Sequence, residues 1–252
     1  TGTVEFEPGG MLTADAASPA VLSVSFALLV GGLGVKAALV PFHGWLPLAM
    51  VAPAPVSALL HAVAVVKAGA FGIVRVVEEV FGTGLFTVLG LGPPLATVAA
   101  VTILYGSFHA LFQDELKRRL AYSTVSQVAY ITLGVALGGT TAAMGGLVHL
   151  VHQGIMKITL FFCAGAMAET LHVHRVSEMA GLGRRMPWTM AAFTVGALGM
   201  IGAPPTAGFM TKWYLGLGAL EAGQGWVVAV LVAISLLNAG YFPPILYTAW
   251  IR

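Results

Sequence analysis

The chain has 252 residues, of which 58% are apolar and 9% charged, and its mean hydropathy is +0.91. This composition excludes an ordinary soluble domain, in which about 25% of residues are charged, and it predicts a polytopic membrane protein. Twelve basic and ten acidic residues give a formal charge of +2, which is too small to indicate a nucleic-acid partner. The single cysteine, Cys163, has no intrachain partner and no metal-ligand spacing.

The first part of the chain predicts three membrane spans. Residues 1–17 contain three acidic and no basic residues, which indicates a loop outside the membrane. Residues 41–55 contain four prolines. Since each interior proline removes a helical hydrogen bond and clashes with the preceding turn, we expect a break or a re-entrant connection there. The spans themselves lie at about 18–40, 56–77 and 89–112, with a loop that opens at Glu78.

The rest of the chain predicts four further spans, one of which is interrupted. They lie at about 120–138, 141–168, 187–203 continued by 206–222, and 226–250. Pro204 and Pro205 make the interruption. The total is seven or eight crossings, depending on how the broken segments are counted.

Two loops rich in basic residues, 113–119 and 169–186, are separated by two predicted spans. They should therefore lie on the same side of the membrane, and the excess of Lys and Arg makes that side cytoplasmic. Counting back through the spans, the proline-rich stretch falls inside, whereas the acidic start and the loop at Glu78 fall outside.

A lysine lies in the middle of the span at 141–168. Between Leu120 and Met156 there is no charged residue, and the next one after Lys157 is Glu169. A charge at mid-membrane costs roughly 2.5 to 3.5 kcal/mol on the insertion scale, so it usually faces a polar interior and marks an ion or proton path. The alternative is a lysine that snorkels to the interface. The polar residues that precede it by one to two turns are His149, His152 and Gln153.

Three further lysines, Lys36, Lys67 and Lys212, also lie in apolar surroundings. Burial brings a lysine within range of reversible proton exchange, and His61 and the histidines near Lys157 could link neighbouring lysines. Lys36 and Lys212 each lie within two turns of a proline break, where transporters often place ion sites. The alternative for these two is an interfacial anchor.

Nothing else in the sequence indicates a reaction centre. There is no glycine-rich phosphate loop, no metal-ligand spacing and no Ser, His and Asp arrangement, so we expect neither a metal nor a cofactor. His172, His174 and Glu178 could bind a metal, but an exposed loop explains them better. Tyr122 and Ser126 are expected to add secondary polar groups to the path.

Four ordered blocks resemble a known family. They are VKAALVPFHGWLPLAMVAPAPVSALLHAVAVVKAG, QDELKRRLAYSTVSQVAY, HLVHQGIMK and GLGRRMP…GAPPTAGFMTKWYL. Together they are similar to the antiporter-like membrane subunits shared by respiratory complex I, Mrp cation/proton antiporters and membrane-bound hydrogenases, and the similarity runs from Gly31 to Tyr241.

The resemblance implies proton translocation along a mid-membrane polar axis in two inverted repeats with discontinuous helices. The chain is then one transmembrane domain, with residues 18–112 as the end of the first repeat and 113–252 as most of the second. Lys36 resembles the lysine that pairs with a glutamate, Lys157 the central lysine and Lys212 the exit-side lysine. Family histidine or lysine positions are matched by His61, Lys67 and His149.

The sequence departs from the family pattern in three ways. Gln153 occupies the position of a second histidine, with His152 displaced by one residue, and Leu48 replaces the usual aspartate. The glutamate partner of Lys36 would lie upstream of Thr1. We expect no signal peptide, because the start lacks its charged and apolar regions. We also expect a sequence that continues a longer one, with about five spans before it and others after it by resemblance.

The sequence thus predicts an all-α polytopic membrane helix bundle that translocates protons, or exchanges a cation for protons. By resemblance it is the antiporter-like subunit of a complex I-like or hydrogenase-like assembly, without a catalytic centre of its own. Its expected partners are other membrane subunits, the lipid bilayer and the transported H⁺ or Na⁺. Its expected location is a bacterial or archaeal plasma membrane, or an organellar inner membrane. The alternatives are an Mrp-type sodium/proton antiporter subunit and a non-conducting membrane scaffold.

Overall fold

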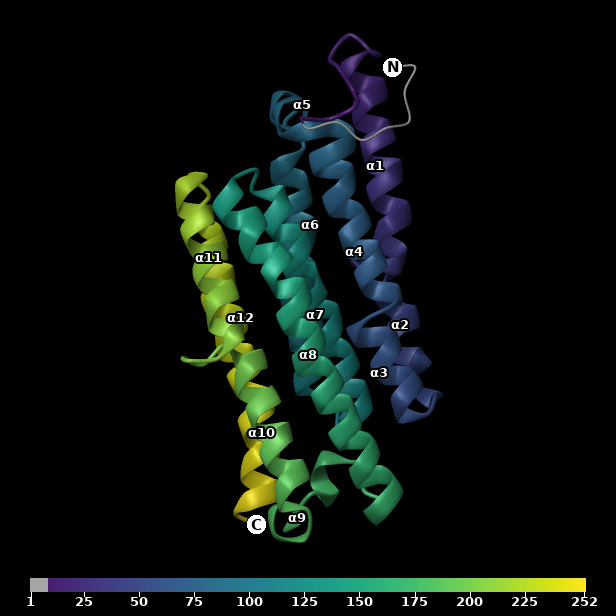
Figure 1. Cartoon of the computed structure of the whole chain (residues 1–252), viewed down its shortest axis with the longest axis vertical. Helices are drawn as coiled ribbons and strands as arrows, with labels where there is room; N and C mark the ends of the chain where they lie inside the picture. Colours follow the sequence, from purple (N-terminus) through teal and green to yellow (C-terminus); the bar gives the residue numbers. More distant parts are fainter. Residues whose placement is uncertain (1–8) are drawn as a thin grey trace.

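The computed structural model describes residues 9–252, and within them all regular elements are helices (Figure 1). The α-helices are α1 Pro19–Lys36, α2 Trp45–Leu48, α3 Ala54–Ala62, α4 Val65–Arg75, α5 Gly82–Val88, α6 Gly92–Leu111, α7 Leu116–Ala136, α8 Thr140–Leu171, α9 Leu182–Arg185, α10 Pro187–Ile201, α11 Ala207–Glu221 and α12 Trp226–Trp250. Short 3₁₀ helices lie at Phe42–Gly44, Ala49–Val51 and Val176–Glu178, and a π-helix lies at Val76–Phe81. The all-α membrane fold predicted from the sequence is confirmed.

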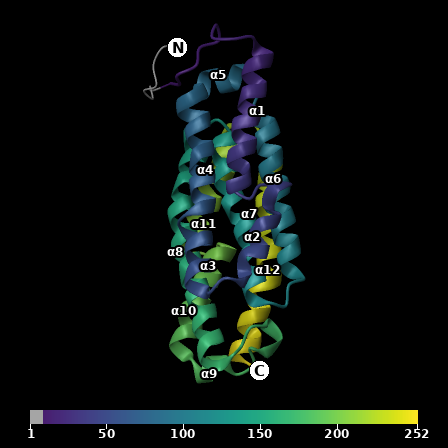
Figure 2. The ribbon, with the colours of Figure 1, turned by 90° about the vertical axis from the view of Figure 1, so that its right-hand side faces the viewer.

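The helices form an elongated bundle with α5 at one end and α9 and the C-terminus at the other (Figures 1 and 2). In the described part of the chain, five spans are long and apolar enough to cross a membrane: Pro19–Lys36, Ala54–Val88, Gly92–Leu111, Thr140–Leu171 and Trp226–Trp250. α7 lies in the middle of the bundle beside them, and α10 and α11 follow one another along one side (Figure 1). The predicted breaks at residues 41–55 and at Pro204 and Pro205 are present, whereas the acidic start lies partly on residues 1–8, outside the described range.

The prediction of a second span at about 56–77 was wrong in two respects. It is interrupted at Val63 and Ala64 without a proline, because the Leu59 carbonyl accepts from both of their backbone N–H groups, at 3.1 and 2.9 Å. It also continues past residue 77, since Glu78 lies in the π-helix and not in an open loop. The predicted loop at 113–119 is shorter than expected as well, because α7 begins at Leu116.

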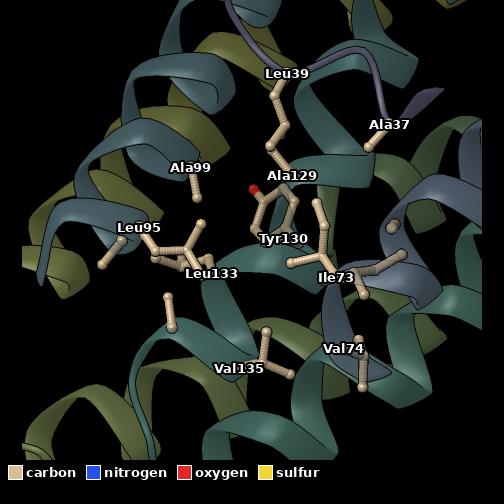
Figure 3. Close-up of a cluster of buried hydrophobic side chains, with 14 of the residues drawn as sticks. Ala37, Leu39, Ile73, Val74, Leu95, Ala99, Ala129, Tyr130, Leu133 and Val135 are labelled. Atoms are coloured by element: carbon tan, nitrogen blue, oxygen red, sulfur yellow. The ribbon is translucent and has the colours of Figure 1, made fainter. Parts of the chain in front are cut away.

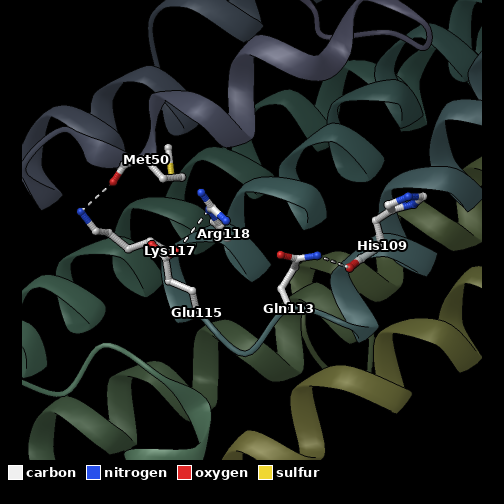
Figure 4. Close-up of polar contacts among 6 residues, drawn as sticks. All are labelled: Met50, His109, Gln113, Glu115, Lys117 and Arg118. Carbon is white, nitrogen blue, oxygen red and sulfur yellow. Dashed lines mark hydrogen bonds and ion pairs between the residues drawn. The ribbon is translucent and has the colours of Figure 1, made fainter.

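The two basic loops lie together at one end of the bundle, as predicted. The backbone N–H of Val176 donates to the carbonyl of Asp114 at 2.8 Å, and that of Leu116 donates to the carbonyl of His174 at 3.0 Å. Figure 4 shows Lys117, in the first turn of α7, whose Nζ donates to the carbonyl of Met50 at 3.1 Å. This end of α7 therefore holds the end of the proline-rich stretch.

Buried apolar side chains form two separate clusters along the bundle. On α7 the first cluster starts at Val125 and the second ends at Ala121, while on α12 the first ends at Ile234 and the second starts at Tyr241. Figure 3 shows part of the first cluster, around Tyr130. Buried polar residues lie between the two clusters, and we call this set the polar layer: His61, Ser107, Ser123, Thr124, Gln153, Lys157 and Asn238.

Candidate functional site

Lys157 lies in the middle of α8, and its side chain is fully buried. Its Nζ donates to the carbonyl of Leu120 at 2.8 Å and to Oγ of Ser123, both on α7. Among the described residues, ion pairs join Arg75 to Glu79 and Arg118 to Glu115, and neither pair involves Lys157. Neutral dipoles therefore hold this amine, without a carboxylate counter-ion.

His61 and Gln153 are the unsatisfied polar groups of the polar layer. His61, on α3, lies within electrostatic range of Lys157, and its ring centroid is 4.8 Å from that of Phe161. Among the described residues, both ring nitrogens of His61 and both amide atoms of Gln153 are buried without a hydrogen-bond partner. Because buried polar groups are nearly always hydrogen-bonded, these atoms are the candidates in the polar layer for bonding to ordered water.

Lys67 approaches α8 just beyond the interruption between α3 and α4. Its side chain is 7% exposed, and Nζ donates to the carbonyl of Leu150. Gly154 makes this approach possible, since a Cβ there would overlap Nζ of Lys67 and lie 3.1 Å from the carbonyl oxygen of Ala62. A groove of about 650 Å³ between the interruption and α8 opens beside the amine.

His149 connects α8 to the second broken pair of helices. Its Nδ1 lies 3.2 Å from Oγ1 of Thr211 on α11, and its ring centroid is 5.0 Å from that of Tyr130 on α7. Both Lys67 and Lys212 lie within electrostatic range of the His149 ring. The histidine is therefore near two of the predicted lysines.

Lys212 bonds to the broken end of α10. Its Nζ donates to the carbonyl of Ile201 and, at 2.8 Å, to Oγ of Ser235 on α12. Ile201 is the last residue of α10, and the residue four positions later is Pro205, which has no N–H to donate. The lysine thus satisfies a carbonyl that the proline break leaves free.

The other predicted residues lie apart from this group. Lys36 is exposed in the last turn of α1, and no described residue bonds it. His152 is half-buried, and its Nδ1 has no partner in the protein. Ser126 accepts from Ser107 Oγ at 2.9 Å, next to the polar layer. The ring of Tyr122 stacks on His109, with centroids 5.5 Å apart, and contacts none of the four lysines.

Glu178 has a local role in the loop at 169–186. Its carboxylate accepts from the backbone N–H groups of His174 and Arg175, at 3.1 Å each. These two hydrogen bonds favour the ionised form and hold the pKa of Glu178 below its usual value of 4.5. The carboxylate therefore orders the loop backbone.

Sequence reasoning missed the polar face of α12. Asn238 and Tyr241 are buried in the bundle, and Ser235 contacts Lys212. These side chains are uncharged, so a search for charge in apolar spans does not find them. The sequence signal that could have identified them is their spacing of three residues, which places them on one face of a helix.

Comparison with known proteins was made by sequence and by structure. The family model "NADH:quinone oxidoreductase/Mrp antiporter, TM" matches residues 1–238. The NADH-quinone oxidoreductase subunit N of Desulforudis audaxviator is 43% identical over 256 residues, which cover 100% of this chain and 50% of that protein. The chain thus spans about half the length of this relative.

Two solved structures resemble the fold. A chain of the Mrp complex from Dietzia sp. superposes with a TM-score of 0.86 at 32% identity, covering 92% of this chain and 43% of the other. A chain of respiratory complex I from Thermus thermophilus superposes with a TM-score of 0.81 at 25% identity, covering 96% and 50% respectively. The same helix arrangement therefore occurs in both assemblies.

Proposed function

Because the chain belongs to the family of membrane proteins of NADH:quinone oxidoreductase and Mrp antiporters, we propose that it carries protons across the membrane through its polar layer. The path runs from Lys67 past His61 and Gln153 to Lys157, and on to Lys212. His149 and Thr211 provide a second connection, from Lys67 to Lys212. Lys36 would extend the path at the end of α1, and His152 would add a titratable group beside it.

One observation carries this proposal. Lys157 is fully buried beside Met156, Leu160 and Leu120 of the second apolar cluster. Among the described residues, however, its amine bonds to a carbonyl and a hydroxyl and to no carboxylate. A buried ion pair would bind its proton tightly, and losing one partner would be costly. Fixed neutral dipoles allow the amine to gain and lose a proton without leaving a buried carboxylate unpaired. The unsatisfied atoms of His61 and Gln153 support water as the carrier between side chains.

The parent assembly is also part of the proposal. The three relatives described above come from multi-subunit membrane complexes, and this chain covers 43 to 50% of each of them. We infer that the full-length subunit binds other membrane subunits, and that a complex I-like or hydrogenase-like partner drives the transport. The charge state of one lysine then biases its neighbours, because unit charges interact strongly in a poorly screened interior.

Lys157→Ala in the full-length subunit tests the proposal. The assembled complex is reconstituted in vesicles, and acidification is followed with a pH-sensitive dye after the driving reaction starts. We expect the variant to assemble and to lose proton pumping, whereas Arg184→Ala, at an exposed position in α9, should pump normally. Undiminished pumping by Lys157→Ala would remove the proposed function.

A second candidate is cation/proton exchange without a redox partner, as in an Mrp-type antiporter. The similarity to the Mrp chain, with a TM-score of 0.86 at 32% identity, is the observation that supports it. A sodium gradient imposed on the reconstituted complex without any electron donor distinguishes the two. Sodium-driven acidification would support exchange, and a response only to the electron donor would support redox-driven pumping.

The remaining alternative is a scaffold with ion-paired lysines in a dry interior. Within residues 9–252 the ion pairs lie at Arg75 and Arg118, outside the polar layer. The lysine amines bond instead to carbonyls and hydroxyls. This pattern supports transport over the scaffold.

A further inference from the structure

α12 carries three polar residues at a spacing of three: Ser235, Asn238 and Tyr241. Residues three apart lie on the same face of an α-helix. Asn238 is fully buried and Tyr241 is 1% exposed, so this face points into the bundle. The proposed path does not use any of the three.

One end of this polar face reaches the acceptor of Lys157. The Tyr241 hydroxyl donates to Oδ1 of Asn238 at 2.8 Å. Ser107 donates to the same Asn238 oxygen at 3.2 Å. The Tyr241 oxygen lies near the hydroxyl of Ser123, which accepts from Lys157 and donates to the carbonyl of Leu120. Tyr241 therefore lies beside the hydroxyl that accepts from the central amine.

The other end reaches the acceptors of Lys212. Nδ2 of Asn238 donates to the carbonyl of Met200 at 3.0 Å, and the next carbonyl, that of Ile201, accepts from Lys212. In an unbroken helix these two carbonyls would accept from the residues four positions later, which are Pro204 and Pro205. Neither proline has an N–H, so the two carbonyls are free for Asn238 and Lys212.

We propose that Ser235, Asn238 and Tyr241 link Lys157 to Lys212 as positioning residues. The link rests on the proposed function and adds a connection along α12 to it. Asn238 fixes the end of α10 that presents a carbonyl to Lys212, while Ser235 provides the second acceptor of the same amine. Tyr241 joins this end to Ser123. A change in the bond between Lys157 and Ser123 thereby alters the positions of the carbonyl and the hydroxyl that accept from Lys212.

Four single variants of the full-length subunit, in the assembled and reconstituted complex, test the link. Tyr241→Phe removes only one oxygen, and Ser235→Ala removes only the hydroxyl that Lys212 contacts. Both should assemble normally and lower the proton-pumping rate about tenfold, which corresponds to the loss of one positioning hydrogen bond of about 1.4 kcal/mol. Ser235→Thr restores the hydroxyl and should restore pumping. If Ser235 mattered only for the volume that it fills, the larger threonine would not restore pumping.

The fourth variant, Tyr247→Phe, is the matched control: the same change on the same helix at an exposed position (52% exposed). It should pump at the wild-type rate. Wild-type pumping by both Tyr241→Phe and Ser235→Ala, together with an inactive Lys157→Ala, would overturn the link and leave the proposed function standing. Equal loss in Ser235→Thr and Ser235→Ala would also overturn it. Active Lys157→Ala would instead remove the proposed function itself.

Discussion

Gly154→Ala tests whether the position of Lys67 matters for transport. The added Cβ would overlap Nζ of Lys67 and lie 3.1 Å from the carbonyl oxygen of Ala62. The lysine end is flexible and the adjacent groove holds about 650 Å³, so the amine can swing away while the helices stay in place. We therefore expect the contact between Lys67 and Leu150 to be lost without unfolding.

The magnitude follows from two opposing terms. A hydrogen bond from a charged group contributes about 1.5 to 3 kcal/mol, whereas replacing a helical glycine by alanine stabilises the helix by about 1 kcal/mol. The net loss of stability is then about 0.5 to 2 kcal/mol. The position of the amine depends on the hydrogen-bond term alone, because the helix term acts on folding. Since 1.4 kcal/mol corresponds to a tenfold population change, a loss of about 1.5 to 3 kcal/mol makes the properly placed amine about tenfold rarer or more.

The assay combines thermal unfolding of the purified complex with proton pumping in vesicles. Gly154→Ala should lower the pumping rate about tenfold, in line with the rarer amine, with a small change in thermal stability. Gly84→Ala is the matched control, because a Cβ at that position meets nothing within 4 Å, and it should leave pumping unchanged. Wild-type pumping by Gly154→Ala would refute the reasoning that Lys67 must reach Leu150.

Three further predictions concern the central lysine and the loop end of the bundle. Lys157→Met should leave thermal stability unchanged or raise it by about 1 to 4 kcal/mol, as for other buried charged groups replaced by apolar ones. The Leu120 carbonyl keeps a partner in this variant, because Ser123 still donates to it at 2.9 Å. A loss of stability above about 3 kcal/mol would instead indicate that the lysine has a structural role. Lys117→Ala should speed amide hydrogen exchange in residues 49–52, because its Nζ bonds the carbonyls of Met50 and Ala52 at 3.1 and 2.8 Å. Arg118→Ala, which breaks an exposed ion pair, should change that exchange little. Two backbone N–H donors lower the pKa of Glu178, so its carboxylate should protect the amides of His174 and Arg175 from hydrogen exchange above pH 4.5. The protection should be lost as the pH falls through the lowered pKa. Glu178→Gln should remove the protection at pH 7, and unchanged exchange of these two amides would contradict this.

Much of the fold follows from charge and proline positions. The long run without charge on either side of Lys157 predicts α8, and the prolines at 41–55 and 204–205 predict the two breaks, because a missing N–H interrupts a helix wherever it occurs. The interruption at Val63 and Ala64 could not be predicted in this way. It depends on two N–H groups that share the Leu59 carbonyl, and the local sequence has no helix-breaking residue.

The candidate site was only partly accessible from the sequence. Titratable residues in apolar spans stand out, so Lys67, His149 and Lys157 could be named. Neutral partners do not stand out: Asn238 matters because a proline on another segment, Pro204, frees the Met200 carbonyl that it bonds. Tyr122, named for its polarity, instead stacks on His109, because helix orientation decides which face meets the lysines.

The measurement that tests the account most directly is a map of the assembled complex at a resolution that shows ordered water. The account predicts water bonded to the ring nitrogens of His61 and to the amide of Gln153, continuous from Lys67 to Lys157. Aliphatic side chains that fill this space, with no polar route from one amine to the next, would contradict it.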